Sequence, residues 1–132
     1  MAAVAGRAIF EQQSAWPFDE TIERLSQAIS NAGLTLFAVI DHARNASDAG
    51  LSMSPSTVLI YGRAEGGTPI MEAHPESALD LPLRVLVRET ADGLTIVSFH
   101  PIKQALATLG VPASLAARLE PAQHLLLKAI AP

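Results

Sequence analysis

The chain has 132 residues and a mass of 13.9 kDa, which is enough for one compact domain and too little for two. Hydrophobic residues make up 49% and charged residues 17%, a composition that excludes disorder as the main state. Thirteen acidic against nine basic residues give a net charge of −4, which argues against nucleic acid or an anionic membrane as a partner. The chain has no cysteine, so disulfides and thiolate chemistry are excluded.

The sequence also bears on location and on the number of domains. No stretch of about 18 residues is apolar enough to cross a bilayer, and the first ten residues lack the apolar core of a signal peptide. We therefore expect a cytoplasmic protein with no membrane segment. No repeat or low-complexity linker divides the chain, so residues 1–132 are expected to form a single domain.

The first third of the chain predicts a strand, a helix and a second strand. Residues 8–14 alternate imperfectly and are expected to form an edge strand. Apolar residues recur at steps of three and four over residues 18–32, acidic residues fill the first turn and Gly33 follows, which predicts an amphipathic helix. Residues 34–40 carry apolar side chains on both alternating faces. We expect them to form the central strand of the sheet.

The middle of the chain predicts two short helices on either side of a strand. Asp41 is a good N-cap for a helix over residues 43–49, and the β-branched segment 57–61 predicts a strand. After two glycines, Thr68 can act as an N-cap with proline at the first helical position, so a short helix is expected over residues 70–74.

The last half predicts a hairpin and a helical tail. Residues 83–89 and 94–99 flank an Asp-Gly pair that tolerates a tight reversal. The segment after Pro101 is rich in alanine and leucine and predicts two or three short helices. The order of elements indicates an α+β fold: a two-layer sandwich in which a mixed or antiparallel sheet of about five strands carries helices mainly on one face.

The pair Asp41-His42 follows a strand, where sheet proteins often carry their sites. An aspartate can orient a histidine and raise its basicity, but neighbouring residues in extended chain point to opposite faces. A capping role explains Asp41 without any chemistry, and it places His42 in the first turn of a helix. We favour the capping interpretation and keep both residues as ligand-binding candidates.

The four histidines do not form a local metal motif. No two of them are three to five residues apart, so no metal site is predicted from the sequence. A site assembled from distant residues, for instance His42, His74 and Asp80, stays open. No Gly-x-Ser-x-Gly elbow is present, so acyl transfer through a serine is unsupported.

The glycine-containing segment 62–68 lies between a strand and a helix, where free backbone amides can receive an anion. It lacks the lysine of a phosphate-binding loop, and Glu65 would repel a phosphate. A flexible surface turn is the simpler interpretation. Arg63 is the residue of this segment that favours a carboxylate or phosphate ligand, through a charge-assisted hydrogen bond.

The strand at 83–89 has one apolar face and one face bearing Arg84, Leu86 and Arg88. The latter face is either solvated or a subunit interface. A leucine between two arginines suits a symmetric dimer in which each arginine meets a carboxylate of the partner.

Several segments, taken in order, resemble one bacterial family, the domain of unknown function 302. The segments that carry the resemblance are Asp41-His42-Ala43, Gly50-Leu51, Tyr61-Gly62, Gly67-Thr68-Pro69-Ile70-Met71 and Ala78-Leu79-Asp80-Leu81-Pro82-Leu83. The resemblance runs over residues 18–99, so a family-like core at about 8–100 is expected to be followed by a helical extension at about 101–131. It implies a compact α+β fold that pairs as a homodimer.

The resemblance also implies which polar residues matter. The positions that match are Asp41, His42, Asp80, Thr68, Pro69 and Met71. Arg63 stands where relatives are expected to carry asparagine, and Phe99-His100 stands where Tyr-Asn is more usual. A site that needs an amide or a phenol at those positions is therefore not expected in this chain.

These observations lead to three functional hypotheses. The first is a homodimeric module, regulatory or binding, that holds a small molecule in a cleft lined by Asp41, His42, Thr68, Met71 and Asp80. The second is an enzyme or a metal- or haem-binding protein that uses His42 with Asp41 or Asp80. The third is a pure assembly domain. The sequence identifies no cofactor, ligand or reaction.

Overall fold

The computed structural model describes residues 7–132. Its centre is a five-stranded antiparallel sheet with the strand order β1-β5-β4-β3-β2. The strands are β1 (Phe10–Gln13), β2 (Thr35–Asp41), β3 (Ser56–Gly62), β4 (Leu83–Glu89) and β5 (Thr95–Phe99). The predicted α+β class with about five strands is confirmed, and every strand pairing is antiparallel.

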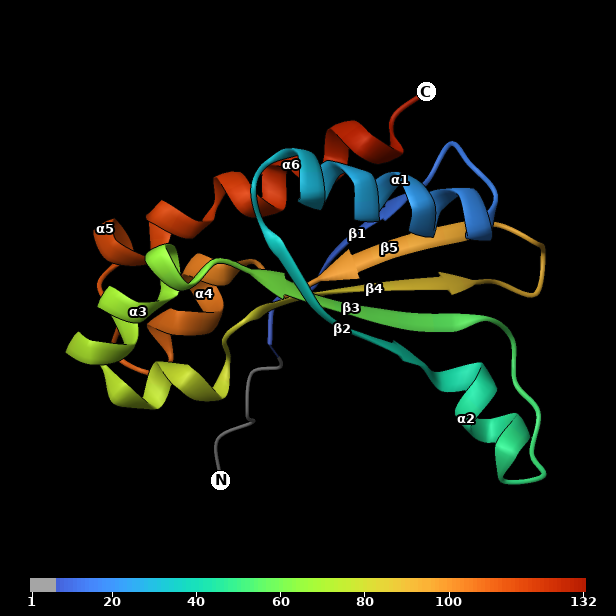
Figure 1. Ribbon diagram of the computed structural model, residues 1–132, viewed down its shortest axis with the longest axis horizontal. Helices are drawn as coiled ribbons and strands as arrows, with labels where there is room; N and C mark the ends of the chain where they lie inside the picture. Colours follow the sequence, from blue (N-terminus) through green and yellow to red (C-terminus); the bar gives the residue numbers. More distant parts are fainter. Residues whose placement is uncertain (1–6) are drawn as a thin grey trace, which may run out of the picture.

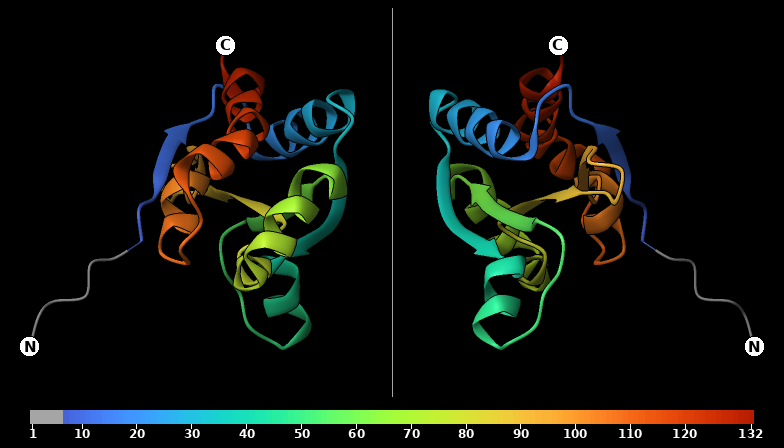
Figure 2. Two further views of the ribbon diagram at one scale, coloured as in Figure 1. Left: turned by 90° about the vertical axis from the view of Figure 1, so that its left-hand side faces the viewer. Right: turned by 90° about the vertical axis from the view of Figure 1, so that its right-hand side faces the viewer.

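The helices lie on one face of the sheet and at its two ends (Figures 1 and 2). Helices α1 (Phe18–Asn31) and α6 (Pro121–Ile130) pack together on the same face of the sheet. The short helix α2 (His42–Asp48) lies at one end. A group of helices occupies the other end: α3 (Ala64–Ala73), η1 (Pro75–Leu79), α4 (Ile102–Ala107), α5 (Ala113–Ala116) and η2 (Ala117–Leu119).

The core forms where α1 and α6 meet the middle strands. Alternate residues of the strands point toward the helices, and residues three or four positions apart on each helix point toward the strands. The fully buried members include Leu59, Tyr61, Val85, Val87 and Val97 from the sheet and Leu25, Ile29, Leu126 and Ile130 from the helices. The helix predicted at residues 18–32 is thus present and buries the stripe that its periodicity indicated.

The hairpin and the first helical cap agree with their sequence patterns. β4 and β5 pair directly, and Gly93 in the turn has a φ of +82°, a conformation that glycine adopts without strain. The side chain of Asp41 accepts a hydrogen bond of 2.9 Å from the backbone N–H of Arg44, which makes it the N-cap of α2.

The prediction that residues 34–40 form the central strand is wrong, because β2 lies at the edge of the sheet. Its side chains Phe37 and Val39 are 51% and 53% exposed. The pairing with β3 shifts register between Leu36 and Ala38, so Phe37 sits in an irregularity of the ladder. A run of apolar residues predicts a buried strand, because the sequence pattern does not show whether the strand has a neighbour on both sides or on one side only.

The helix predicted at residues 70–74 is much longer than expected. α3 begins at Ala64, and the two glycines and Thr68 lie inside it rather than before it. Its first turn closes through bonds from the N–H groups of Gly66 and Gly67 to the carbonyl of Arg63, at 3.0 and 3.1 Å. Tertiary packing against the C-terminal segment overrides the low helix propensity of glycine at these positions.

The C-terminal segment is tied to the rest of the fold by specific hydrogen bonds. The buried amide of Gln123 accepts from the N–H of Ile102 at 3.0 Å and donates to the carbonyl of His100 at 2.9 Å. The indole of Trp16 donates to the carbonyl of Ala131 at 3.2 Å. These bonds make α6 an integral layer of the domain.

Within residues 7–132, no helix combines the length and the hydropathy that a bilayer-spanning segment needs.

Candidate functional site

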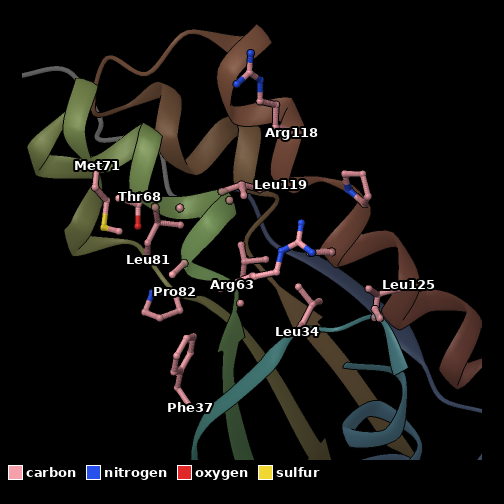
Figure 3. A pocket seen from close by; sticks show the side chains of 18 residues that line it. Leu34, Phe37, Arg63, Thr68, Met71, Leu81, Pro82, Arg118, Leu119 and Leu125 are labelled. Carbon is pink, nitrogen blue, oxygen red and sulfur yellow. The ribbon is translucent and has the colours of Figure 1, made fainter. Parts of the chain in front are cut away.

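A pocket of about 400 Å³ opens where α3, the end of β3 and the C-terminal helices meet (Figure 3). This volume lies within the range of about 300–1,000 Å³ that is usual for small-molecule sites. Four parts of the chain supply the walls: the turn into β2 with Phe37, the segment 62–71, the segment 81–83, and the helical tail around Arg118, Leu119 and Leu125.

The walls are mainly apolar, and two glycines of α3 keep the space open. A Cβ on Gly67 would meet the Met71 Cε at 3.6 Å and the Leu81 Cδ1 at 3.9 Å, so any longer side chain there would project into the pocket. A Cβ on Gly66 would come within 3.3 Å of the Leu119 Cδ2, so glycine lets the tail approach α3 closely.

The charged side chains that line the pocket are Arg63 and Arg118, and none of the described lining residues is acidic. In Figure 3 the side chain of Arg63 lies in the middle of the lining residues, near Leu119 and Leu34. The Arg63 Nε is 3.7 Å from the Glu65 Oε2, and both side chains are more than half exposed. Such an exposed ion pair is weak, so the guanidinium is available to a ligand.

Tyr61 links the sheet to α6, which forms one wall of the pocket. Its hydroxyl donates a hydrogen bond of 2.8 Å to the carbonyl of Ala122, a residue that lines the pocket. Burial raises the pKa of the Tyr61 phenol well above its ordinary value, because a phenolate would be poorly solvated there. Tyr61 is therefore a neutral structural donor at neutral pH.

Three of the six candidates from sequence meet in this pocket. Arg63, Thr68 and Met71 all line it. Asp80 immediately precedes the lining residue Leu81, but its carboxylate is engaged elsewhere: the Oδ1 lies 3.3 Å from the Nη2 of Arg7.

The structure does not bring Asp41 and His42 into the pocket. Thr35, at the start of β2, pairs with Gly62, whereas Asp41, at its end, pairs with Thr57. Seven residues of strand separate the two ends by about 20 Å at ~3.3 Å per residue. His42 is the exposed first residue of α2. The residues expected to line one cleft thus lie in two places: Thr68 and Met71 line the pocket near the start of β2, and Asp41 and His42 lie at its other end.

The histidines do not converge either. His42 begins α2, His74 follows the end of α3, and the Nδ1 of His100 lies 2.7 Å from the carbonyl oxygen of Ala8. Within the described residues, no three histidine, cysteine, aspartate or glutamate side chains are grouped closely enough to hold a metal ion. The structure therefore does not bring His42, His74 and Asp80 together as the metal site that the sequence allowed.

The contributions of Phe37 and of the tail to the pocket are not apparent from the sequence. The apolar pattern of residues 34–40 predicts a central strand that includes Phe37, and no periodicity distinguishes a core side chain from one that lines a pocket. Arg118 had a signal: it is the one charged residue in the apolar segment 111–119. A lone arginine among alanines and leucines is a candidate for a specific charged contact.

Comparisons with known proteins agree with this fold. The crystal structure of the uncharacterized conserved protein DUF302 from Bacillus stearothermophilus superimposes with a TM-score of 0.79 over 92% of this chain and 94% of that one, at 15% identity. Over 93 residues, 70% of this chain, the sequence is 32% identical to the fluoride-specific ion channel FluC 1 of Brucella suis and to FluC 1 of Brucella abortus. The matched stretch covers 37% and 34% of those relatives, so the chain spans about a third of their length.

The family model described as "Domain of unknown function DUF302" matches residues 10–131. The match continues past Phe99, where the sequence resemblance stopped, and includes the helices that form the second wall of the pocket. The chain therefore belongs to the DUF302 family.

Proposed function

We propose that the protein is a binding module for a small molecule, which is held in the pocket between α3 and the C-terminal helices. The observation that carries this proposal is the pocket itself, with about 400 Å³ of space, mainly apolar walls and a few polar groups at defined positions. That combination is the usual make-up of a ligand site. The candidates Arg63, Thr68 and Met71 keep their proposed binding role, whereas Asp41 and His42 do not line this pocket.

The residues that line the pocket favour binding over catalysis. The polar side chains among them are Arg63, Thr68 and Arg118. General acid–base catalysis needs a group that exchanges a proton near neutral pH, most often histidine or a carboxylate. Neither type occurs among the described lining residues, so the proposed role is to hold a molecule without transforming it.

The relatives support a regulatory use of such a module. The Brucella proteins are named as fluoride-specific ion channels, and this chain corresponds to only about a third of their length. A domain that occurs within longer proteins is suited to sensing a ligand on behalf of another part. A cytoplasmic location belongs to the same proposal, and the absence of cysteine is compatible with it.

Binding is tested by isothermal titration of the purified protein with a 10-carbon panel that contains decanol and decanoate. A Gly67→Leu variant fills the pocket, and Ala107→Leu, on an exposed face of α4, is the matched control. We expect at least one compound to bind the wild type and the control, and to bind Gly67→Leu at least about tenfold more weakly. Equal binding to all three proteins would place the ligand elsewhere, and no binding of any compound would count against the proposal.

We also propose that the protein forms a homodimer through the face of the sheet opposite α1 and α6. Support comes from the side chains on that face, which include Val58, Ile60 and Leu86 between the cations Arg84 and Arg88. Light scattering at micromolar concentration is expected to give twice the monomer mass, and Leu86→Glu is expected to halve it. A monomeric wild type would refute this part of the proposal.

A further inference from the structure

We infer that the pocket takes an amphiphile: an apolar chain that ends in one anionic oxygen group, a carboxylate or a phosphate monoester, bound by Arg63. This inference rests on the proposed binding function and adds the chemical class of the ligand. It follows from the distribution of charge around the pocket, from the position of Arg63 at the start of a helix and from the weakness of its present ion pair.

The distribution of charge is the first step. The protein is acidic overall, with a net charge of −4, yet both charged side chains that line the pocket are cationic. Arg63 lies in the middle of the lining residues, whereas the Arg118 side chain, at the rim, points away from them (Figure 3). A central arginine and a second one at the rim, with no acidic residue in the described lining, favour an anion over a cation.

The backbone around Arg63 adds to this attraction. Arg63 is the N-cap residue of α3, a ten-residue helix, and no side chain caps the helix start. The positive end of the helix dipole is therefore directed at the same region as the guanidinium. A carboxylate or phosphate placed there is favoured by both, and a guanidinium can bind two of its oxygens at once.

The ion pair between Arg63 and Glu65 is the third step. The Nε to Oε2 distance is 3.7 Å, and the two side chains are 54% and 74% exposed. A pair of this length and exposure holds its partners weakly. An incoming anion can therefore replace the Glu65 carboxylate, and Glu65 acts as a competitor that lowers the affinity for anionic ligands.

The apolar walls account for the other end of the ligand. Met71, Leu81 and Pro82 lie to one side of Arg63 and Phe37 lies below them (Figure 3). Phe37 is half exposed, so an apolar chain bound there would cover apolar surface that is otherwise in contact with water. A flexible methionine in this wall adapts to chains of different shape.

The test compares four compounds with the same 10-carbon chain and different heads: decanoate, decyl phosphate, decanol and decyltrimethylammonium. The three charged compounds are kept below their critical micelle concentrations and decanol below its solubility limit. Isothermal titration is carried out on the wild type, Arg63→Gln, Arg118→Gln and Glu65→Gln. Arg44→Gln, on the exposed surface of α2, is the matched control for loss of an arginine.

We expect an anionic compound to bind the wild type at least about tenfold more tightly than decanol, and the ammonium compound to bind most weakly. Arg63→Gln should abolish that preference, Glu65→Gln should increase the affinity for the anion about two- to threefold, and Arg44→Gln should change neither. The comparison of decanoate with decyl phosphate identifies the head group that is preferred.

Two results would overturn the inference, and both differ from a failure of the binding function. If decanol binds as tightly as both anionic compounds, the pocket binds apolar chains but has no preference for an anion. If the anion preference survives in Arg63→Gln and is lost in Arg118→Gln, the assignment of the head group to Arg63 is wrong. If no compound binds in a manner sensitive to Gly67→Leu, the binding function itself fails.

Discussion

The hydroxyl of Tyr61 on β3 donates a hydrogen bond of 2.8 Å to the carbonyl of Ala122 on α6, which joins the sheet to the helix that closes the pocket. The carbonyl belongs to a residue 61 positions further along the chain. The bond is part-buried, so water cannot replace it at low cost. The position of the second wall thus depends on a contact between two residues that are far apart in the sequence.

Removal of this bond should weaken the fold without abolishing it. We expect Tyr61→Phe to lower the free energy of unfolding by about 1 kcal/mol, because the ring stays buried while one hydrogen bond is lost. Urea denaturation, monitored by circular dichroism, measures this change in the free energy of unfolding. An unaltered midpoint would mean that the bond contributes nothing to the stability of the fold.

The same residue predicts a loss of stability at high pH. Burial raises the pKa of the Tyr61 phenol above its ordinary value of about 10, so the unfolded chain releases this proton at a lower pH than the folded chain does. The contribution of the neutral Tyr61 phenol to the free energy of unfolding is complete below about pH 10 and decreases as the pH rises above that value.

Because Tyr61 is the only tyrosine, a spectrophotometric titration reports on it alone. Tyrosinate absorbance should appear only as the protein unfolds in alkali, and Tyr61→Phe should lose less stability between neutral and alkaline pH than the wild type. Tyrosinate formation near pH 10 in a protein that is still folded would contradict the burial.

The glycines of α3 predict a stabilising substitution. Gly67→Ala should raise the free energy of unfolding by about 0.5–1 kcal/mol, because alanine is the better helix former and its Cβ makes ordinary contacts with side-chain ends, Met71 Cε at 3.6 Å and Leu81 Cδ1 at 3.9 Å. Gly66→Ala should raise the free energy of unfolding by less, because its Cβ comes within 3.3 Å of the Leu119 Cδ2. Urea denaturation of both variants tests the order, and destabilisation by Gly67→Ala would refute it.

The buried amide of Gln123 predicts a large loss of stability. Gln123→Met has a similar shape but leaves the N–H of Ile102 and the carbonyl of His100 without partners, so we expect a loss of about 2–4 kcal/mol. The neighbouring exposed residue gives a control: His124→Gln should stay within about 0.5 kcal/mol of the wild type. Thermal and urea unfolding of both variants provide the comparison.

Asp41 allows the capping role to be separated from a ligand-binding role. Asp41→Ala should lower the free energy of unfolding by about 0.5–2 kcal/mol, because the hydrogen bond from the Arg44 N–H is lost. Asp41→Asn should retain most of the wild-type stability, because asparagine is also a good N-cap. Neither variant should change the affinity for the 10-carbon compounds. Weaker binding by both would restore Asp41 to the ligand site.

Local patterns in the sequence determine much of this fold. The amphipathic helix α1, the β4–β5 hairpin with Gly93 in its turn, and the cap at Asp41 each depend on residues within about 15 positions of one another. The physical causes are equally local: helix periodicity, freedom of the glycine backbone and one side-chain bond to a nearby N–H. The family resemblance rested on short motifs of the same kind.

The tertiary structure alone decided the order of the strands and the location of the pocket. An apolar segment such as β2 reads the same at the edge of a sheet as in the middle, because its neighbours come from elsewhere in the chain. The segment around Arg63 is enough to make this residue a candidate for binding an anion. That it shares a pocket with Arg118, and not with Asp41 and His42, depends on packing between α3 and the tail, which no local period encodes.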